Sequence, residues 1–173
     1  HSTGIPPRSE VSRPADVSSQ FVSALMIVAP NAQDRIAIKL PAPLQSRHYA
    51  ELTAFMQSKF GVSSSISEDF TLFKMYPQHY RPAEVSIDAD WSSAAFLFAA
   101  GAIAGKVAVS GVNGYSLQPD RCIVEALKQL GAKVTTSRYG VTVQRPDRLE
   151  PIVFDLTDSP DLLPILAVLC ALG

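Results

Sequence analysis

The apolar residues of this chain follow one pattern twice, and this internal repeat limits the folds that the sequence can adopt. Each copy predicts a helix, a strand, a second helix and a pair of strands, and is expected to be entered from a strand. A single copy cannot cover both faces of its sheet, so we expect the copies to pack together. Equivalent pairs open the first helix and close the second in each copy: Ser18-Ser19 and Ser92-Ser93, Phe60-Gly61 and Leu130-Gly131.

The first copy begins with a helix from Ser18 that Pro30 ends, in which Phe21, Leu25 and Val28 share one face. We expect this helix to be among the most buried. The other elements of the copy are expected as a strand at 35–40, a helix at 47–60 with Gly61 as its C-cap, and weak strands at 62–66 and 70–75.

The second copy contains an almost wholly apolar helix at 92–104, which we expect to lie at the centre of its unit. A third round of the pattern opens with a strand at 152–156 and a helix from Asp161. The other elements of the second copy are expected as strands at 85–88 and 106–110, an amphipathic helix at 120–130 with Ile123, Leu127 and Leu130 inward, and a hairpin of 134–137 with 141–144.

The composition narrows the classes of function. The chain has 173 residues, 47% of them hydrophobic, and a net charge of −1, which is enough apolar material for a core and gives no basic surface for nucleic acid or anionic lipid. Its longest apolar stretch, 94–104, is too short to span a membrane. Cys122 and Cys170 lie far apart in apolar runs, which favours buried reduced thiols, and no Cys or His cluster indicates a metal.

The ends of the sequence indicate that the chain is part of a longer protein. It begins with His1 rather than Met, and its last apolar run stops at Gly173. The first residues have neither the charged segment nor the apolar segment of a signal peptide. We therefore expect a fragment.

Two hydroxyls and an amide, from Ser18, Ser19 and Gln20, stand at the start of the first helix. A capping role accounts for one serine, because serine is a preferred N-cap residue. The free backbone N–H groups and the positive end of the helix dipole make the same place suitable for an anion such as phosphate. Both interpretations stay open from the residues alone.

The second helix of the same copy opens in a similar way. Ser46 precedes Arg47, His48 and Tyr49, so a hydroxyl again stands at a helix start with a cation beside it. A capping serine with a solvated arginine is the alternative. Because both helices belong to one copy of the repeat, their starts can lie at one edge of the sheet and hold one phosphate from two sides. His48 has no partner at a metal-ligand spacing and is interpreted as a surface residue.

Two carboxylates begin helices in the second half of the chain. Asp90 precedes Trp91-Ser92, and Asp161 follows Ser159-Pro160. Capping together with the helix dipole explains either residue.

Taken together, five motifs in this order resemble the EPSP synthase family (3-phosphoshikimate 1-carboxyvinyltransferase). The chain resembles the family from residue 17 to residue 173. The matching segments are Val17-Ser18-Ser19-Gln20-Phe21, Ser46-Arg47-His48-Tyr49, Asp90-Trp91-Ser92-Ser93-Ala94, Ser116-Leu117-Gln118-Pro119-Asp120-Arg121 and Asp155 to Asp161.

The resemblance implies an α/β (α+β) fold of two similar domains, each built from βαβαββ units around a pseudo-threefold axis, in the manner of an inverse αβ-barrel. Residues 1–84 would end the domain that binds shikimate 3-phosphate, and residues 85–173 would begin the second domain. The segment from Tyr76 to Pro82 is the boundary expected between them. The site would lie between the domains.

The resemblance also implies roles for individual residues. Ser18, Ser19 and Ser46 would bind the 3-phosphate of shikimate 3-phosphate, and Gln20 and Tyr49 would contact the shikimate ring. Asp161 would accept a hydrogen bond from the 5-hydroxyl and help to remove its proton, and Asp90 would lie nearer phosphoenolpyruvate. The reaction implied is an addition–elimination that transfers the enolpyruvyl group.

The resemblance implies a cytoplasmic enzyme that is a monomer at full length and uses no metal or organic cofactor, nucleic acid or membrane. His48 departs from the family's usual proline and Pro119 from its usual glycine, and neither removes a site position. The family's other cationic positions fall outside the chain, so the fragment alone is expected to be inactive. The alternatives are a UDP-N-acetylglucosamine enolpyruvyltransferase and a non-catalytic binding or scaffold fragment.

Overall fold

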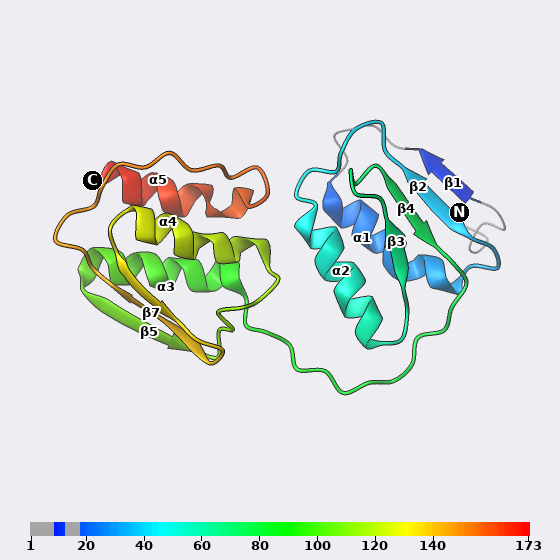
Figure 1. The fold of residues 1–173 in the computed structure, drawn as a ribbon, viewed down its shortest axis with the longest axis horizontal. Coiled ribbons are helices and arrows are strands. Elements are labelled where there is room, and N and C mark those ends of the chain that lie inside the picture. The colour runs from blue at the N-terminus through cyan, green and yellow to red at the C-terminus, as the bar shows by residue number, and fades with distance from the viewer. Residues whose placement is uncertain (1–8, 13–17) are drawn as a thin grey trace. The chain divides into compact units, whose positions relative to one another are not determined.

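The chain folds into two units of helices packed on a sheet, divided between Val85 and Ser86. The computed structural model describes residues 9–12 and 18–173. Figure 1 shows the helices and strands of each unit. Each unit has a hydrophobic core built from its own residues, one around Phe73 and the other around Phe98. The units are described separately below.

The first unit has the complete βαβαββ order that the sequence predicts. Its sheet has the strand order β1-β2-β4-β3, in which β1 is parallel to β2 and the other neighbours are antiparallel. A parallel pair needs a crossover connection, and α1 supplies it. The elements are β1 (Ser9–Ser12), α1 (Ser19–Val28), the short 3-10 helix η1 (Ala29–Asn31), β2 (Ile36–Lys39), α2 (His48–Lys59), β3 (Ser64–Ile66) and β4 (Leu72–Met75).

The core of the first unit lies between one face of this sheet and its two helices. Ile36 pairs with Met75 and Ile38 with Phe73, so all four side chains lie on one face of the sheet. These side chains are buried together with residues of both helices, such as Val22 and Ala50.

The face that α1 buries differs from the prediction. Val22 and Met26 are buried, whereas Phe21 and Val28 are at least half exposed. The physical reason is that α1 is apolar around most of its circumference, so its periodicity does not select a face. The expectation that α1 is among the most buried helices is therefore wrong, because the side that carries Phe21 and Val28 is exposed.

The C-terminal end of α1 is held by two side chains from later in the chain. Pro30 has no N–H, so the Met26 carbonyl lacks its usual helical partner. The Gln57 amide nitrogen donates to that carbonyl at 2.9 Å, and the Tyr80 hydroxyl donates to the Ile27 carbonyl at 2.8 Å. These bonds fix α1 to α2 and to the segment that follows β4.

The second unit repeats this order without the entering strand. Its sheet has the order β5-β7-β6, which corresponds to β2-β4-β3 of the first unit. This equivalence confirms the repeat of helix, strand, helix and two strands. The two serine pairs are not equivalent, because Ser18 is the N-cap residue of α1 whereas Asp90 is that of α3. The elements are α3 (Trp91–Ala104), β5 (Lys106–Ser110), the 3-10 helix η2 (Pro119–Cys122), α4 (Ile123–Gln129), β6 (Lys133–Thr136), β7 (Gly140–Gln144), the 3-10 helix η3 (Pro160–Leu162) and α5 (Leu163–Ala171).

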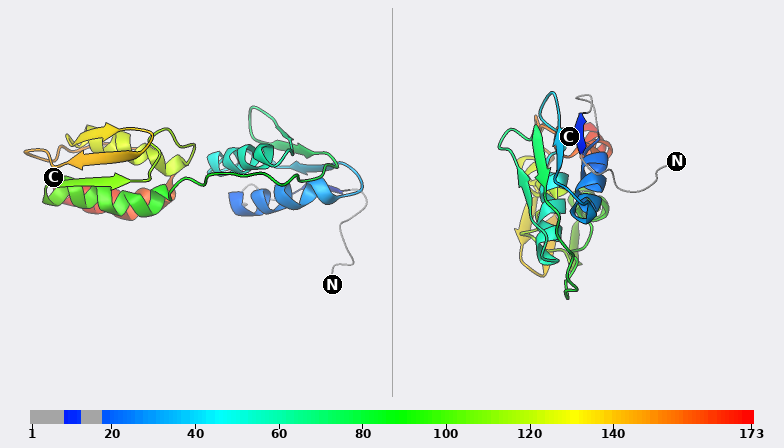
Figure 2. Two further views of the ribbon diagram at one scale, coloured as in Figure 1. Left: turned by 90° about the horizontal axis from the view of Figure 1, so that it is seen from below. Right: turned by 90° about the vertical axis from the view of Figure 1, so that its right-hand side faces the viewer.

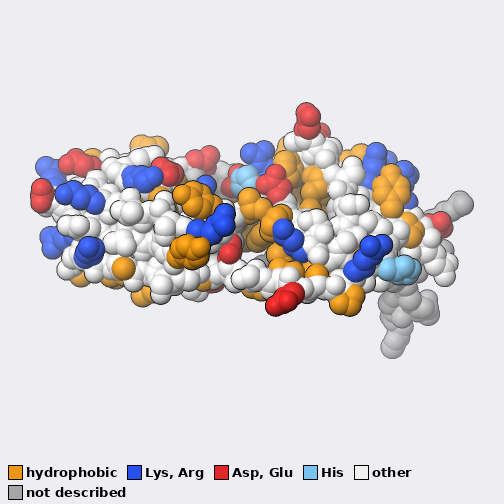
Figure 3. Space-filling view, turned by 60° about the horizontal axis from the view of Figure 1, so that its bottom comes forward, with side chains coloured by type: hydrophobic (Ala, Val, Ile, Leu, Met, Phe, Trp, Pro, Cys, Tyr) orange, Lys and Arg blue, Asp and Glu red, His pale blue; other side chains and the backbone are white. Residues whose placement is uncertain are grey.

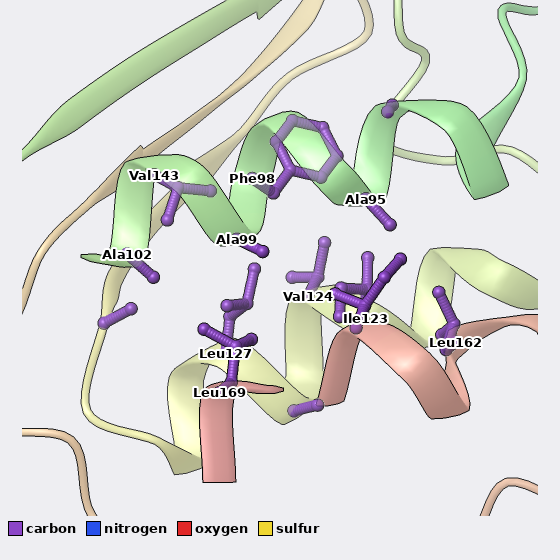
Figure 4. Packing of buried hydrophobic residues seen from close by; sticks show 14 of the residues in the cluster. Ala95, Phe98, Ala99, Ala102, Ile123, Val124, Leu127, Val143, Leu162 and Leu169 are labelled. Atoms are coloured by element: carbon purple, nitrogen blue, oxygen red, sulfur yellow. The ribbon is translucent and has the colours of Figure 1, made fainter. Parts of the chain in front are cut away.

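Helix α3 packs closely against the sheet and against the helices that follow it. Alanines of α3 face α4 and α5 in Figure 4, where Ile123, Leu127 and Leu169 fill the space between the helices. A Cβ at Gly101 would stand 3.0 Å from Val107 Cβ and 3.1 Å from the Val143 carbonyl oxygen, so this position admits little more than a hydrogen atom.

The central position predicted for α3 is confirmed for one face only. Phe98 is fully buried, whereas Phe96 and Leu97 are more than half exposed. Exposed apolar side chains also occur elsewhere: on the side of the molecule drawn in Figure 3, hydrophobic side chains lie among basic and acidic ones.

Two predicted strands are absent from the described residues. Residues 85–88 and 152–156 form no ladder with any described strand. Ile152, Phe154 and Leu156 still alternate toward the core, as a strand would place them. The alternation of apolar residues in the sequence therefore predicted correctly which side chains pack inward. It could not predict a strand, because a strand also needs a neighbouring strand for its backbone hydrogen bonds.

Candidate functional site

The start of α1 has the cap that the sequence predicts. Ser18 is the N-cap residue, and its hydroxyl oxygen accepts the Gln20 backbone N–H at 3.3 Å. Ser19 is buried, whereas Ser18 and Gln20 are exposed. The first turn of α1 carries no acidic residue, so no carboxylate of that turn neutralises the positive end of its dipole.

The start of α2 is built differently, and a capping role for Ser46 is wrong. Arg47 is the N-cap residue and makes no side-chain cap bond. Ser46 has a φ of 50°, in the left-handed region, and its carbonyl accepts the Tyr49 N–H at 3.1 Å. A left-handed serine costs about 1–2 kcal/mol relative to the usual conformations. Strain of this kind is compatible with a functional constraint on Ser46.

Charged side chains at the start of α2 already have partners. The Arg47 guanidinium lies over the Phe70 ring, 5.3 Å from its centroid. His48 Nδ1 lies 2.6 Å from a carboxylate oxygen of Glu51, the acidic residue in the first turn of α2. The guanidinium therefore brings a positive charge to this end of the unit.

The two helix starts lie at the same end of the first unit because α1 and α2 run parallel. The Thr53 hydroxyl donates to Ser23 Oγ, and about one turn later Gln57 donates to the Met26 carbonyl. The partners are 30 and 31 residues apart, and a nearly constant separation is the mark of parallel helices. Continued back by one turn, this alignment sets Ser19 opposite Tyr49. Figures 1 and 2 show both N-termini at one end.

We call this end of the first unit the paired helix start; it comprises Ser18–Gln20 and Ser46–Tyr49. It combines two helix N-termini, three serines and a guanidinium. Free N–H groups and aligned dipoles favour an anion there, and hydroxyls can donate further hydrogen bonds to it. The arrangement is suited chemically to a phosphate group.

In the second unit, Asp90 is the N-cap residue of α3. Its carboxylate accepts the backbone N–H groups of Ser92 and Ser93, each at 3.2 Å, and the Ser93 hydroxyl. The Ser93 hydroxyl, more than the backbone bonds, holds the pKa of Asp90 below its ordinary value. Asp90 is therefore an exposed, ionised cap, in agreement with the capping interpretation.

Asp161 lies on η3, at the start of the last helix, and is exposed. The side chain of the preceding Ser159 makes no cap bond and is buried. A carboxylate in this first turn faces the positive end of a helical segment, as the sequence predicts.

A third carboxylate, Asp120, lies between these two and was not selected from the sequence. It is 1% exposed, and one of its oxygens accepts a hydrogen bond from the Ser92 hydroxyl. Burial raises the pKa of Asp120, and the nearby charges of Asp161 and Asp90 raise it further. A signal for it was available, because Asp120 stands on the inward stripe that continues through Ile123 and Leu127.

The structure therefore gathers the candidate residues into two sets. Asp90, Ser92, Asp120, Ser159 and Asp161 form the carboxylate cluster of the second unit, and the serines, Gln20 and Tyr49 belong to the paired helix start of the first. Within residues 9–12 and 18–173, no group of side chains has the geometry of a metal site. No helix in the same part of the chain is long and apolar enough to cross a membrane.

Solved structures show which fold this chain has. EPSP synthase from Acinetobacter baumannii matches 92% of the chain with a TM-score of 0.71 at 19% identity, and the chain covers 38% of that structure. The enolpyruvyl transferase NikO from Streptomyces tendae matches 99% of the chain with a TM-score of 0.68 at 15% identity, with 43% of that structure covered. At such identities the likeness concerns the fold, which is that of the enolpyruvyl transferases.

The sequence comparisons identify the family within this class. The EPSP synthase (3-phosphoshikimate 1-carboxyvinyltransferase) family model matches residues 6–173, and the chain belongs to this family of transferases. Proteins named 3-phosphoshikimate 1-carboxyvinyltransferase are 40% identical over 164 residues in Dehalococcoides mccartyi strain 195 and 39% identical over 165 residues in Methanosphaerula palustris. Each match covers 95% of the chain, and the chain spans 39% of the length of these relatives.

Proposed function

We propose that the polypeptide to which this chain belongs transfers the enolpyruvyl group of phosphoenolpyruvate to the 5-hydroxyl of shikimate 3-phosphate. The observation that carries the proposal is the paired helix start within a chain of the EPSP synthase family. In this proposal Ser18, Ser19 and Ser46 bind the 3-phosphate, and Gln20 and Tyr49 contact the ring. Residues 1–84 end the domain that binds shikimate 3-phosphate, and 85–173 begin the second.

The proposed chemistry is an addition followed by an elimination. The 5-hydroxyl oxygen bonds to C2 of phosphoenolpyruvate while C3 gains a proton, which gives a tetrahedral intermediate. Loss of inorganic phosphate from C2 and of a proton from C3 then forms the enolpyruvyl ether. Asp161 takes the hydroxyl proton, and Asp90 orients cationic groups near phosphoenolpyruvate. A general base of this kind acts only within hydrogen-bond reach of the proton that it removes.

The family membership favours this reaction over the alternatives. A UDP-N-acetylglucosamine enolpyruvyltransferase fits the fold likeness alone, but the relatives described above, at about 40% identity, are named 3-phosphoshikimate 1-carboxyvinyltransferase. We propose further that the whole enzyme is a cytoplasmic monomer. Because the relatives are more than twice as long as this chain, we expect no turnover from the 173 residues alone.

The test is a comparison of two ligands that differ only in the phosphate. Replacing both Ser18 and Ser19 with alanine should weaken binding of shikimate 3-phosphate by about 3 kcal/mol or more, because each hydrogen bond to a charged group contributes about 1.5–3 kcal/mol. Binding of shikimate should change little. Isothermal titration calorimetry on the polypeptide that contains this chain measures both affinities, alongside an assay of enolpyruvyl transfer.

Ser58→Ala is the matched control. Its hydroxyl donates to the Phe55 carbonyl near the opposite end of α2, so its loss removes a serine without touching the paired helix start. Equal weakening of both ligands in the double variant, or a loss of stability with an unchanged preference for shikimate 3-phosphate, would leave the serines as helix caps only.

A further inference from the structure

Asp120 combines burial with an unsatisfied polar atom, which is unusual in a core. It belongs to η2, directly before α4, and is 1% exposed. One oxygen accepts the Ser92 hydroxyl, while Oδ1 has no hydrogen-bond partner among the described residues. An unsatisfied buried oxygen lowers stability, so packing alone does not account for a carboxylate at this position.

The neighbours of Asp120 come from both elements that carry the candidate carboxylates. The start of α3 supplies the Ser92 hydroxyl and the charge of Asp90, and η3 supplies the Ser159 hydroxyl and the charge of Asp161. Arg121 and Cys122 follow on the same turn, and partial burial raises the pKa of the Cys122 thiol. Asp120 is thus the point at which these two helix starts meet.

The protonation state of this carboxyl depends on the same neighbours. Burial is the largest influence and raises its pKa, the charges of Asp161 and Asp90 act in the same direction, and the hydrogen bond from Ser92 opposes them. A proton on Oδ1 would turn the unsatisfied acceptor into a donor. Loss of that proton would give Asp120 a negative charge next to the carboxylate of Asp161.

We propose that Asp120 is a positioning residue, which joins the turn that carries Asp161 to the Asp90 end of α3 through its hydrogen bond with Ser92 and its place beside that turn. The inference rests on the proposed function for its catalytic consequence. It extends that function, because it assigns a buried residue to the geometry and the charge state of the two exposed carboxylates. Asp120 itself need not touch the substrates.

The test compares Asp120→Asn with Asp147→Asn in the polypeptide that contains this chain. Asparagine keeps the size of the side chain and an oxygen for Ser92 but cannot ionise. We expect kcat to fall at least tenfold, with the KM for each substrate changed less than threefold. We also expect the pH dependence of kcat to change shape at its acidic side, and the unfolding temperature to stay the same or rise. Asp147 is an exposed carboxylate of the same unit, and its variant should match the unaltered enzyme.

A second variant, Ser92→Ala, removes the link to α3 but keeps the carboxylate, and should lower kcat by a smaller factor. An Asp120→Asn enzyme with unchanged kcat and pH profile would overturn the proposal. So would a loss of kcat that merely follows a lowered unfolding temperature, because that result would make the role structural.

Failure of the proposed function gives a different result, namely an unaltered enzyme that transfers no enolpyruvyl group. The positioning role is then tested by NMR titration of the 173-residue chain. Ionisation of the Asp120 carboxyl should add a titration step to the amide signals of Ser92 and Asp161, beyond the steps caused by Asp90 and Asp161 themselves, and this step should be missing in Asp120→Asn. Amide signals that titrate alike in both chains would overturn the inference.

Discussion

Ser46 shows how a single residue can separate stability from binding. Its φ of 50° is unfavourable for serine and natural for glycine, while its hydroxyl belongs to the proposed phosphate site. Ser46→Gly should therefore raise the free energy of unfolding by up to about 1 kcal/mol, because it relieves backbone strain. The same change should weaken binding of shikimate 3-phosphate, because the hydroxyl is lost.

Ser46→Ala is the matched comparison, since it removes the hydroxyl and retains the strain. Urea denaturation and calorimetric titration of both variants measure the two effects. Glycine and alanine variants of equal stability would show that the left-handed backbone carries no strain. Unchanged affinity in both would remove Ser46 from the site.

The cap formed by Asp90 should make the stability of the second unit depend on pH. The pKa of this carboxyl is lowered in the folded protein, so its stabilising contribution is present above the ordinary value of 3.8 and is lost as the pH falls through the lower, folded value. Asp90→Ala should therefore lower the free energy of unfolding by about 1 kcal/mol at pH 7, the usual effect of losing an N-cap.

Thermal unfolding of Asp90→Ala between pH 3 and pH 7 checks this sign. The difference from the unaltered chain should shrink as the pH falls below about 3.8, where an ordinary aspartate becomes protonated. A difference that stays constant across the range would mean that the carboxylate charge is not what caps α3. Asp147→Ala should show no comparable effect.

At the scale of elements, the position of α1 depends on side chains that reach it from far along the chain. Gln57 is buried and donates to both the Met26 carbonyl and the Tyr80 hydroxyl, while its own oxygen accepts from Ser64. Gln57→Leu leaves these partners unsatisfied and should destabilise the first unit by about 2–3 kcal/mol. Tyr80→Phe loses only the bond to Ile27 and one bond to Gln57, and should cost about 1 kcal/mol.

Chemical denaturation monitored within the first unit ranks these variants. Ser58→Ala is again the control, because its hydroxyl makes one exposed bond within α2. Similar stabilities for Gln57→Leu and Ser58→Ala would contradict the view that Gln57 holds the C-terminal end of α1.

The elements also show what the sequence could predict and why the rest was out of reach. The inward face of α4 was predicted because this helix has a polar side, and Ile123 and Leu127 are fully buried as predicted. Its start was not predicted, because the first residues of the helix expected at 120–130 belong to the 3-10 helix η2. For α1 the predicted limits were right, but the predicted buried face was wrong. A helix that is apolar around most of its circumference gives no indication of which face packs inward. The strand at 85–88 failed because pairing depends on a neighbour that local sequence does not describe.

In the candidate site, too, local features were predictable and features that depend on distant segments were not. Helix caps are local, and Ser18 and Asp90 are the caps that the sequence indicated. The left-handed backbone of Ser46 and the burial of Asp120 arise from contacts between distant segments. Only the place of Asp120 on an inward stripe hinted at its surroundings.

For the whole molecule, the structure predicts a sharp contrast in backbone protection. Residues 82–89 belong to no described helix or strand, whereas residues 94–102 lie in the middle of α3. Amide hydrogens exchange through local opening, which is easiest where backbone hydrogen bonds are few. Hydrogen–deuterium exchange with mass spectrometry should show the segment 82–89 exchanged within seconds and α3 protected at least about a hundredfold longer, as expected for a core element.

Strong protection across 82–89 would indicate that this segment pairs with a strand in solution, as the repeat had predicted for 85–88. Mild proteolysis offers an independent check, because cleavage should occur first in this segment. Cleavage that begins inside β7 or α3 would contradict the division of the chain at Val85.

The caps of α1 and α3 suggest how a duplicated scaffold can diverge. The two helices hold equivalent places in the repeat, but one start is capped by the neutral Ser18 and the other by the anionic Asp90. The carboxylate places a negative charge at the start of its helix, whereas the neutral serine places none at the start of α1. A change of one side chain can thus give two copies of a repeat different charges at equivalent helix starts, while the order of the elements stays the same.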